Sequence, residues 1–169
     1  MEYVIRMRRI RADNRGVEGL PLNLMVSLLV LAIALPQAFL WFDAYSLERA
    51  DSGTREEVGA ILSAARQCYF QGVGNSRSVD VDLRGAYGHE LRRVTIGDAL
   101  PNGERRCLAS YKIGGQGEQL LVMEPSVPLT SPGNAALSFG AGSHTVIAEC
   151  KEAAAAGGGR LVYVELRLA

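Results

Sequence analysis

The pattern of hydrophobic and polar residues changes twice along the chain, and each part predicts a different element. The stretch Leu20–Phe42 has no charged residue over about 23 positions, so a helix there would reach ~35 Å and cross a bilayer core of ~30 Å. Residues 54–71 then carry apolar side chains at helical spacing, which predicts an amphipathic helix. From Ser76 onward apolar and polar residues alternate, which predicts strands.

The amphipathic helix has sequence signals at both ends. Thr54 and Glu57 form a capping box, which predicts a helix start and favours a bend at Gly53. Gly72 and Gly74 predict its end. The residues expected on its buried face are Val58, Ile61, Leu62, Ala65, Cys68 and Tyr69.

The alternating region predicts an antiparallel β-sandwich or a barrel-like domain, because short strands recur between clusters of turn residues. The proline-containing stretch Pro125–Asn134 has two interpretations, an exposed contact loop or a crossover between sheets. The fold class is therefore α+β, a long N-terminal hydrophobic α-helix followed by an antiparallel β-sandwich or barrel-like domain. After the first strand, the expected strands are Leu91–Ile96, Cys107–Ile113, Gln119–Met123, Ala135–Phe139, Ser143–Cys150 and Arg160–Leu168, the last in the middle of a sheet.

Charge is distributed unevenly although the chain is neutral overall. The first 16 residues contain five arginines and two acidic residues. The rest of the chain, from Val17 onward, contains 13 basic and 16 acidic residues. Because positive flanks stay on the cytoplasmic side, we expect a single-pass protein of the cell membrane with its C-terminal domain outside. No basic patch interleaved with aromatic residues occurs beyond the first 16 positions, so we expect no nucleic-acid partner.

The three cysteines are Cys68, Cys107 and Cys150. An exported domain meets oxidising conditions, so one pair can form a disulfide. Cys107 and Cys150 lie in separate predicted strands and are the preferred pair. Three buried free thiols are the alternative.

Motifs for catalysis, metal binding and cofactor binding are absent from the sequence. We find no phosphate-binding glycine loop, no HExxH helix, no GxSxG turn and no paired CxxC. The two histidines, His89 and His144, match no common zinc spacing. We therefore expect no enzyme activity, no cofactor and no metal site, and an exported hydrolase is the least favoured class.

Three interpretations fit the N-terminus. The first is an uncleaved signal anchor, and the second is a secretory signal cut after the small residues of Ala32–Ala34. The apolar run continues to Phe42, which disfavours the second. The third starts from RADNRGVEGLPLN, where Arg15-Gly16 and a short polar interval precede the long uncharged helix.

This arrangement resembles the class III signal peptides of archaeal type IV pilins and archaellins. The resemblance covers about the first 45 residues, and it implies that a prepilin-type peptidase cuts between Gly16 and Val17, behind Arg15. Glu18 would then be the partner of the new terminal amine, and Gly19 is a second, poorer cut site. Bacterial pilins have glutamate at the fifth mature position, where this chain has Pro21.

The resemblance also implies a division of the chain into residues 1–16 as a cleaved leader, 17–50 as a membrane and filament-core helix, 51–75 as an amphipathic helix continuing the rod, and 76–169 as the β domain. It favours a continuous helix through Gly53. The residues that would face lipid before assembly and sister helices afterwards are Leu20, Leu22, Met25, Leu28, Leu29, Leu31, Ile33, Leu35, Phe39 and Leu40.

The expected function is a structural subunit, major or minor, of an archaeal type IV pilus-like filament on the cell surface. Its partners would be copies of itself or related pilins through the N-terminal helices, the peptidase, and membrane lipid before assembly. The competing class is a single-pass membrane protein that never polymerises and whose β-sandwich binds a ligand outside the cell. The two classes differ in whether the leader is removed.

Overall fold

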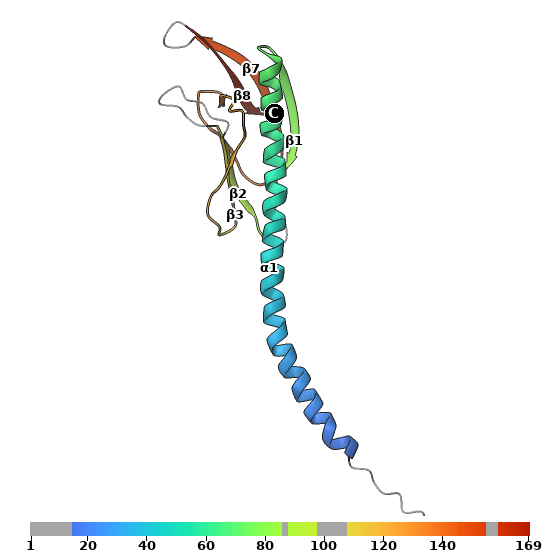
Figure 1. Cartoon of the computed structure of the whole chain (residues 1–169). Helices are drawn as coiled ribbons and strands as arrows, with labels where there is room; N and C mark the ends of the chain where they lie inside the picture. The colour runs from blue at the N-terminus through green and yellow to red at the C-terminus, as the bar shows by residue number, and fades with distance from the viewer. Residues whose placement is uncertain (1–14, 86–87, 98–107, 155–158) are drawn as a thin grey trace, which may run out of the picture. The chain divides into compact units, whose positions relative to one another are not determined.

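Over the residues that the structure describes, the fold consists of one long helix and two four-stranded sheets, which confirms the α+β prediction (Figure 1). The computed structural model describes residues 15–85, 88–97, 108–154 and 159–169, and side-chain environments from Pro21 onward. The chain divides into two compact units, Met1–Asp43 and Ala44–Ala169. Each unit is described by itself below.

Helix α1 (Arg15–Gln71) is continuous through Pro21, Pro36 and Gly53. The continuous helix through Gly53 is confirmed, and the start that the capping box favours at Thr54 is wrong. The Thr54 hydroxyl donates to the carbonyl of Ala50 at 2.9 Å, four residues earlier in the same helix. A threonine inside a helix can satisfy its hydroxyl in this way instead of capping an end. The predicted end is confirmed.

The end of α1 is set by a glycine. Gly72 has a φ of 94°, a left-handed conformation that glycine adopts without a Cβ penalty. Its amide donates to the carbonyl of Tyr69 at 3.1 Å. These features are typical of a helix C-terminus.

One face of α1 is buried from residue 46 to residue 68. The predicted face is confirmed for residues 58–68, and it continues backwards by steps of four residues through Thr54, Ala50 and Ser46. Residues spaced by three and four lie on the same side of a helix, so one stripe packs against the strands. Its buried members are Ser46, Ala50, Thr54, Val58, Ile61, Leu62, Ala64, Ala65 and Cys68.

The strands form two sheets whose orders differ from the order along the chain. In the first sheet the order is β1-β7-β8-β5, and in the second it is β4-β3-β2-β6. Strands β7 and β8 form the long hairpin, and β8 lies inside its sheet as predicted. The bounds are β1 (Ser76–Asp82), β2 (Leu91–Ile96), β3 (Leu108–Ile113), β4 (Gln119–Val122), β5 (Leu129–Thr130), β6 (Leu137–Phe139), β7 (Ser143–Ala154) and β8 (Arg160–Leu168).

The stretch Pro125–Asn134 contains the short strand β5, which was not predicted. Strand β5 pairs with β8 in parallel, whereas the other strand pairings among the described residues are antiparallel. The amide of Val164 donates to the carbonyl of Pro128 at 2.8 Å, and Val127 and Leu129 are buried. The stretch therefore connects the second sheet to the first, and the exposed-loop interpretation is wrong for its central residues.

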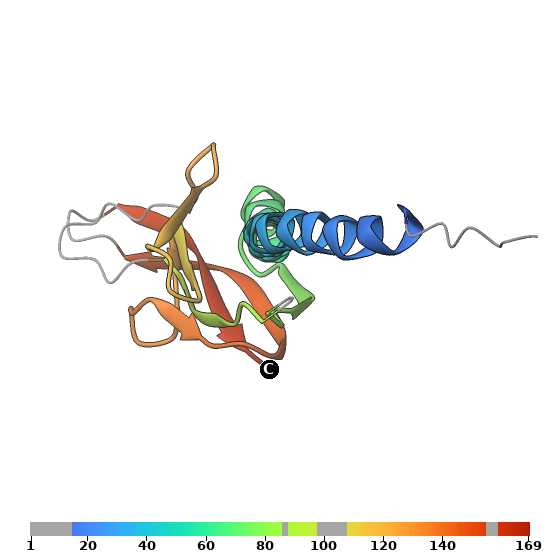
Figure 2. The same cartoon turned by 90° about the horizontal axis from the view of Figure 1, so that it is seen from below.

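A single hydrophobic core joins both sheets to the C-terminal half of α1. It includes Leu62 from the helix, Val164 from the first sheet and Ile96 from the second. Figure 2 views this half of the helix nearly end-on, with the strands gathered beside it. Backbone contacts reinforce the packing, since the amide of Gly74 donates to the carbonyl of Cys150 at 2.9 Å.

Candidate functional site

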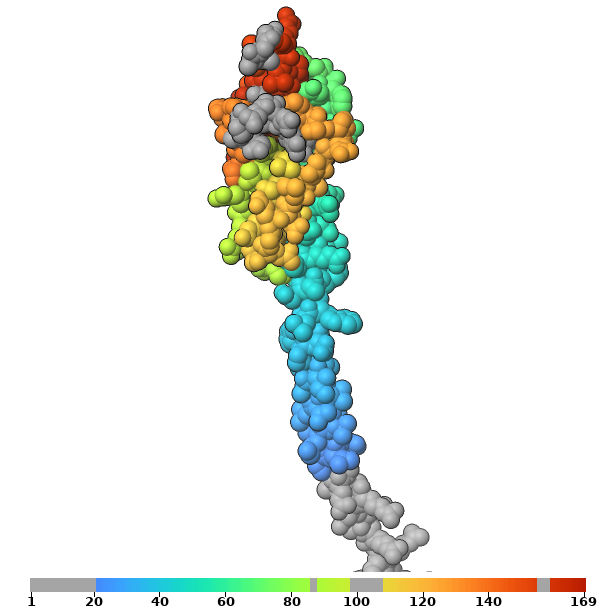
Figure 3. Space-filling view, turned by 60° about the vertical axis from the view of Figure 1, so that its left-hand side comes forward, coloured from blue at the N-terminus to red at the C-terminus, as the bar shows by residue number. Residues whose placement is uncertain are grey.

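The most unusual surface of the molecule is the apolar segment of α1, from Leu22 to Phe42. The relative solvent exposure of its large apolar residues lies between 46 and 78%. Residues 28–31 are consecutive, apolar and all exposed, and four consecutive residues go once around a helix of 3.6 residues per turn. This turn is therefore apolar on every side, and the side chains of the segment stand at the surface in Figure 3.

This segment is long and apolar enough to cross a membrane. An 18-residue window within Pro21–Gln71 has a mean hydropathy of 2.2, and none of that window is buried. A signal sequence near an N-terminus has the same properties. A helix that is hydrophobic all round needs an apolar environment, either lipid or other helices.

The residues of the expected processing site lie at the start of α1. Arg15, Gly16, Val17 and Glu18 belong to its first turn. The positions of their side chains, and that of Leu20, lie outside the described part of the structure. The cleavage site and the role of Glu18 stay predictions.

A serine and a histidine are in contact where α1 meets the segment before β2. The Ser46 Oγ lies 3.1 Å from the His89 Nε2. Ser46 is 2% exposed and sits inside the helix, where the neighbouring amides are used in helix hydrogen bonds, so no oxyanion hole is formed beside it. The Ser46–His89 contact links α1 to the segment before β2. The four-residue spacing from Ser46 to Val58 would have placed Ser46 on the buried face, but no sequence signal identifies His89 as its partner.

A second polar contact lies one turn further along the helix. The Tyr111 hydroxyl donates to the Asp51 carboxylate at 2.9 Å, and Tyr111 is buried. Burial, together with this hydrogen bond, raises the pKa of Tyr111 from 10.0 to about 12. The raised pKa means that the folded state favours the neutral phenol.

We expect Tyr111→Phe to lower the free energy of unfolding by about 1 kcal/mol, because one hydrogen bond is lost and Asp51 can still reach water. In the unchanged protein, the contribution of Tyr111 is full below pH 10.0 and is lost as the pH rises through about 12. Urea unfolding at neutral and alkaline pH measures both effects. Tyr45→Phe, at an exposed tyrosine, is the control. Equal losses in the two variants would contradict the prediction.

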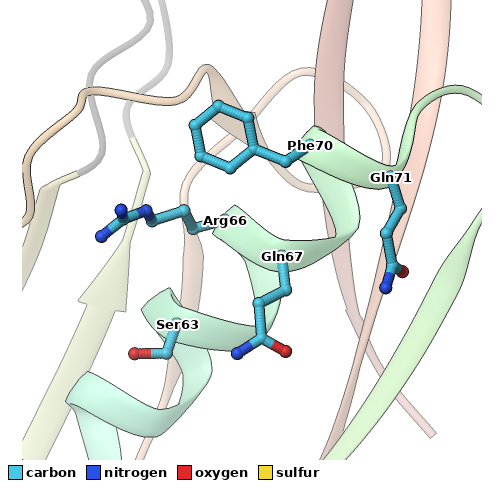
Figure 4. Close-up of a pocket in the computed structure, with 5 residues that line it drawn as sticks. All are labelled: Ser63, Arg66, Gln67, Phe70 and Gln71. Atoms are coloured by element: carbon cyan, nitrogen blue, oxygen red, sulfur yellow. The ribbon is translucent and has the colours of Figure 1, made fainter.

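The last turns of α1 line a surface groove of about 500 Å³ (Figure 4). The Arg66 guanidinium lies 5.7 Å from the centre of the Phe70 ring and donates to the carbonyl of Glu124 at 3.3 Å. These contacts link the helix to the segment after β4. The groove contains no arrangement of acid, base and nucleophile.

The structure describes two of the three cysteines that the disulfide prediction concerns. Cys68 and Cys150 are buried, and neither forms a disulfide with another described residue. Cys107 lies outside the described residues, so the pair Cys107–Cys150 stays a prediction. The Cys68 Sγ donates to the carbonyl of Asn75 at 3.0 Å and to that of Ala148 at 3.5 Å. Burial raises the pKa of both thiols, which lowers the fraction present as the reactive thiolate.

We expect iodoacetamide to modify Cys68 and Cys150 at least about 100-fold more slowly in the folded protein than in guanidinium, because reaction requires local or global unfolding. Peptide mass spectrometry under reducing conditions resolves the two sites. The denatured sample is the control for intrinsic reactivity. Modification at similar rates in both states would contradict the burial of these thiols.

Other candidates for chemistry are few in the part of the chain that the structure describes. No group of three histidine, cysteine or acidic side chains lies close enough to hold a metal ion there. The His144 Nε2 lies 3.0 Å from the carbonyl of Gly140, and its ring is 5.0 Å from that of Phe139. No protein-family model, curated protein or solved structure matches this chain.

Proposed function

We propose that this chain is a subunit of an archaeal type IV pilus-like surface filament. The observation that carries the proposal is the apolar segment of α1, which is exposed on all sides and belongs to the same helix as the buried face at residues 46–68. Lipid surrounds this segment before assembly, and the apolar helices of sister subunits surround it afterwards. The β domain forms the outer surface, and no cofactor takes part.

The few polar residues of the apolar segment support contact between helices. At about 100° per residue, Asn23, Ser27 and Gln37 fall within an arc of about 80° on one side of the helix. Ala34 and Ala38 lie on the same side. Small residues let helices approach closely, and polar side chains form hydrogen bonds between helices in an apolar environment. This side is therefore the preferred contact face.

Removal of the leader is the step that starts assembly. Five arginines before Val17 hold the N-terminus at the cytoplasmic face of the membrane. Cutting after Gly16 removes all five, and the helix can then leave the bilayer. The contacts between subunits are heterologous and do not close, so they generate a helical polymer.

The test is the intact mass of the protein purified from its own cells. A chain that begins at Val17 supports the proposal. The variant Gly16→Val should keep its leader, whereas Gly19→Val, which changes the second candidate site, should be processed normally. Electron microscopy of sheared cell surfaces should then find the chain in filaments for Gly19→Val and not for Gly16→Val.

A chain that still begins at Met1 in wild-type cells would overturn the proposal. The protein would then be a single-pass membrane protein whose β-sandwich acts alone. Cleavage after Gly19 instead of Gly16 would leave the filament proposal intact and would change only the position of the cleavage site.

A further inference from the structure

Three cationic side chains line one groove on the second sheet. Arg92, Arg93 and Lys112 are exposed and surround a hollow of about 320 Å³ over β2 and β3. Glu118 is the carboxylate among the lining residues, so the groove keeps a net positive charge. The hydroxyls of Thr95 and Ser110 add hydrogen-bonding groups between the charges.

The pairing of the strands brings these charges together. Arg93 lies directly opposite Lys112 in the ladder between β2 and β3, and the register shifts between Leu91 and Arg93. Arg92 is thus the extra residue of a β-bulge, and two arginines face one lysine. Like charges directly opposite each other on neighbouring strands destabilise a sheet.

These cations are not neutralised within the described ranges of the chain. The ion pairs found there use Arg84, Lys151 and Arg160, and none uses Arg92, Arg93 or Lys112. A repulsive cluster at a bulge is balanced when an anionic surface covers it. Glu118 offsets one of the three charges, and a further anionic partner would come from outside this part of the molecule.

The other sheet carries a surface of opposite charge. Glu57, Asp80 and Asp82 line a hollow of about 390 Å³ beside β1 and β7. Asp80 accepts a hydrogen bond from Thr145 at 2.6 Å, and Asp82 pairs with Arg84 at 2.9 Å. Each carboxylate has two oxygens and about four acceptor positions, so both can accept further hydrogen bonds.

We propose that the basic groove of Arg92, Arg93 and Lys112 binds the acidic groove of Glu57, Asp80 and Asp82 on a second copy of this chain. The two grooves have complementary charge, and they lie on different sheets, β2–β3 and β1–β7. Because the two patches differ, the contact is heterologous, and a pair of copies keeps one free basic groove and one free acidic groove. Such a contact extends from copy to copy. It involves the β domain and Glu57 of α1, and it does not depend on removal of the leader.

The test uses a zero-length carbodiimide cross-linker, which joins a lysine amine to a carboxylate in direct contact. Full chain labelled with ¹⁵N is mixed with unlabelled full chain in a neutral detergent at low salt. We expect mixed-isotope peptides that join Lys112 of one copy to Asp80, Asp82 or Glu57 of another. Their yield should fall at 1 M salt, where charges are screened beyond ~3 Å.

Charge reversal makes the test specific. Arg93→Glu should lower the yield by about tenfold or more, since like charges then face each other across the contact. The double variant Arg93→Glu with Asp80→Arg should restore it, which also shows that the variants fold. Arg167→Glu, at an exposed arginine on β8 outside both grooves, should leave the yield unchanged.

Two results would overturn the inference. The first is the absence of mixed-isotope peptides at Lys112, or a yield that Arg93→Glu does not change. The second is binding to vesicles containing phosphatidylglycerol but not to neutral vesicles, lost in Arg93→Glu and without cross-links between copies. The groove would then bind lipid headgroups. Neither result bears on the N-terminal mass, so this inference and the filament proposal fail separately.

Discussion

Val30→Arg should abolish incorporation of the chain into filaments while leaving it in the membrane. An arginine at the centre of a membrane helix costs about 2.5–3.5 kcal/mol, whereas each leucine, isoleucine, valine or phenylalanine contributes about −0.3 to −0.6 kcal/mol. The many such residues in Leu20–Phe42 offset one arginine, and its side chain can reach the interface. Between packed helices there is no interface to reach, so assembly fails.

Membrane fractionation and the composition of sheared filaments measure these two effects. Val73→Arg is a matched control, because Val73 is also an exposed valine, 51% against 58% for Val30, but lies after the end of α1. It should assemble normally. Filaments that contain Val30→Arg at wild-type levels would show that the apolar segment does not pack among sister helices.

Leu62→Ala should lower the free energy of unfolding of the β domain by about 2–5 kcal/mol. Leu62 is fully buried where α1 meets the sheets, and removing a buried leucine side chain loses its transfer free energy and leaves a cavity. A loss of this size is a large fraction of the stability of a typical domain. The helix and both sheets share the core, so the domain should unfold in one transition.

Urea unfolding of the full chain in detergent, followed by far-UV circular dichroism, measures this loss. The midpoint should fall and the slope should stay the same. Leu120→Ala, at a leucine on β4 that is 59% exposed, should change the midpoint little. Similar midpoints for the two variants would contradict the position of Leu62 in the core.

The local patterns predicted most elements but not where the helix begins. The apolar period over residues 58–68 was sufficient to identify the buried face. The capping box at Thr54 predicted a start that does not exist, because packing of Ser46 and Ala50 against the domain extends the helix through this point. A cap contributes about 1 kcal/mol, and burial of a longer helical face outweighs it.

In the β domain, too, local patterns predicted some features, whereas others depend on contacts between distant residues. Alternation identified β2 and β8 with their observed bounds, since a half-buried strand repeats every two residues. Strand β5 has two residues next to Pro128 and depends on a parallel partner more than 30 residues later, so no local pattern marks it. The orders β1-β7-β8-β5 and β4-β3-β2-β6 likewise depend on contacts between distant segments.

By itself, the sequence determined the apolar segment, the basic N-terminal stretch, the buried helix face and most of the strands, because each is a property of neighbouring residues. The tertiary structure alone decided the strand orders, the Ser46–His89 and Tyr111–Asp51 contacts, and the cluster of Arg92, Arg93 and Lys112. These features depend on which distant segments meet and in which register. Register is fixed by packing of the whole core, which no local stretch of residues encodes.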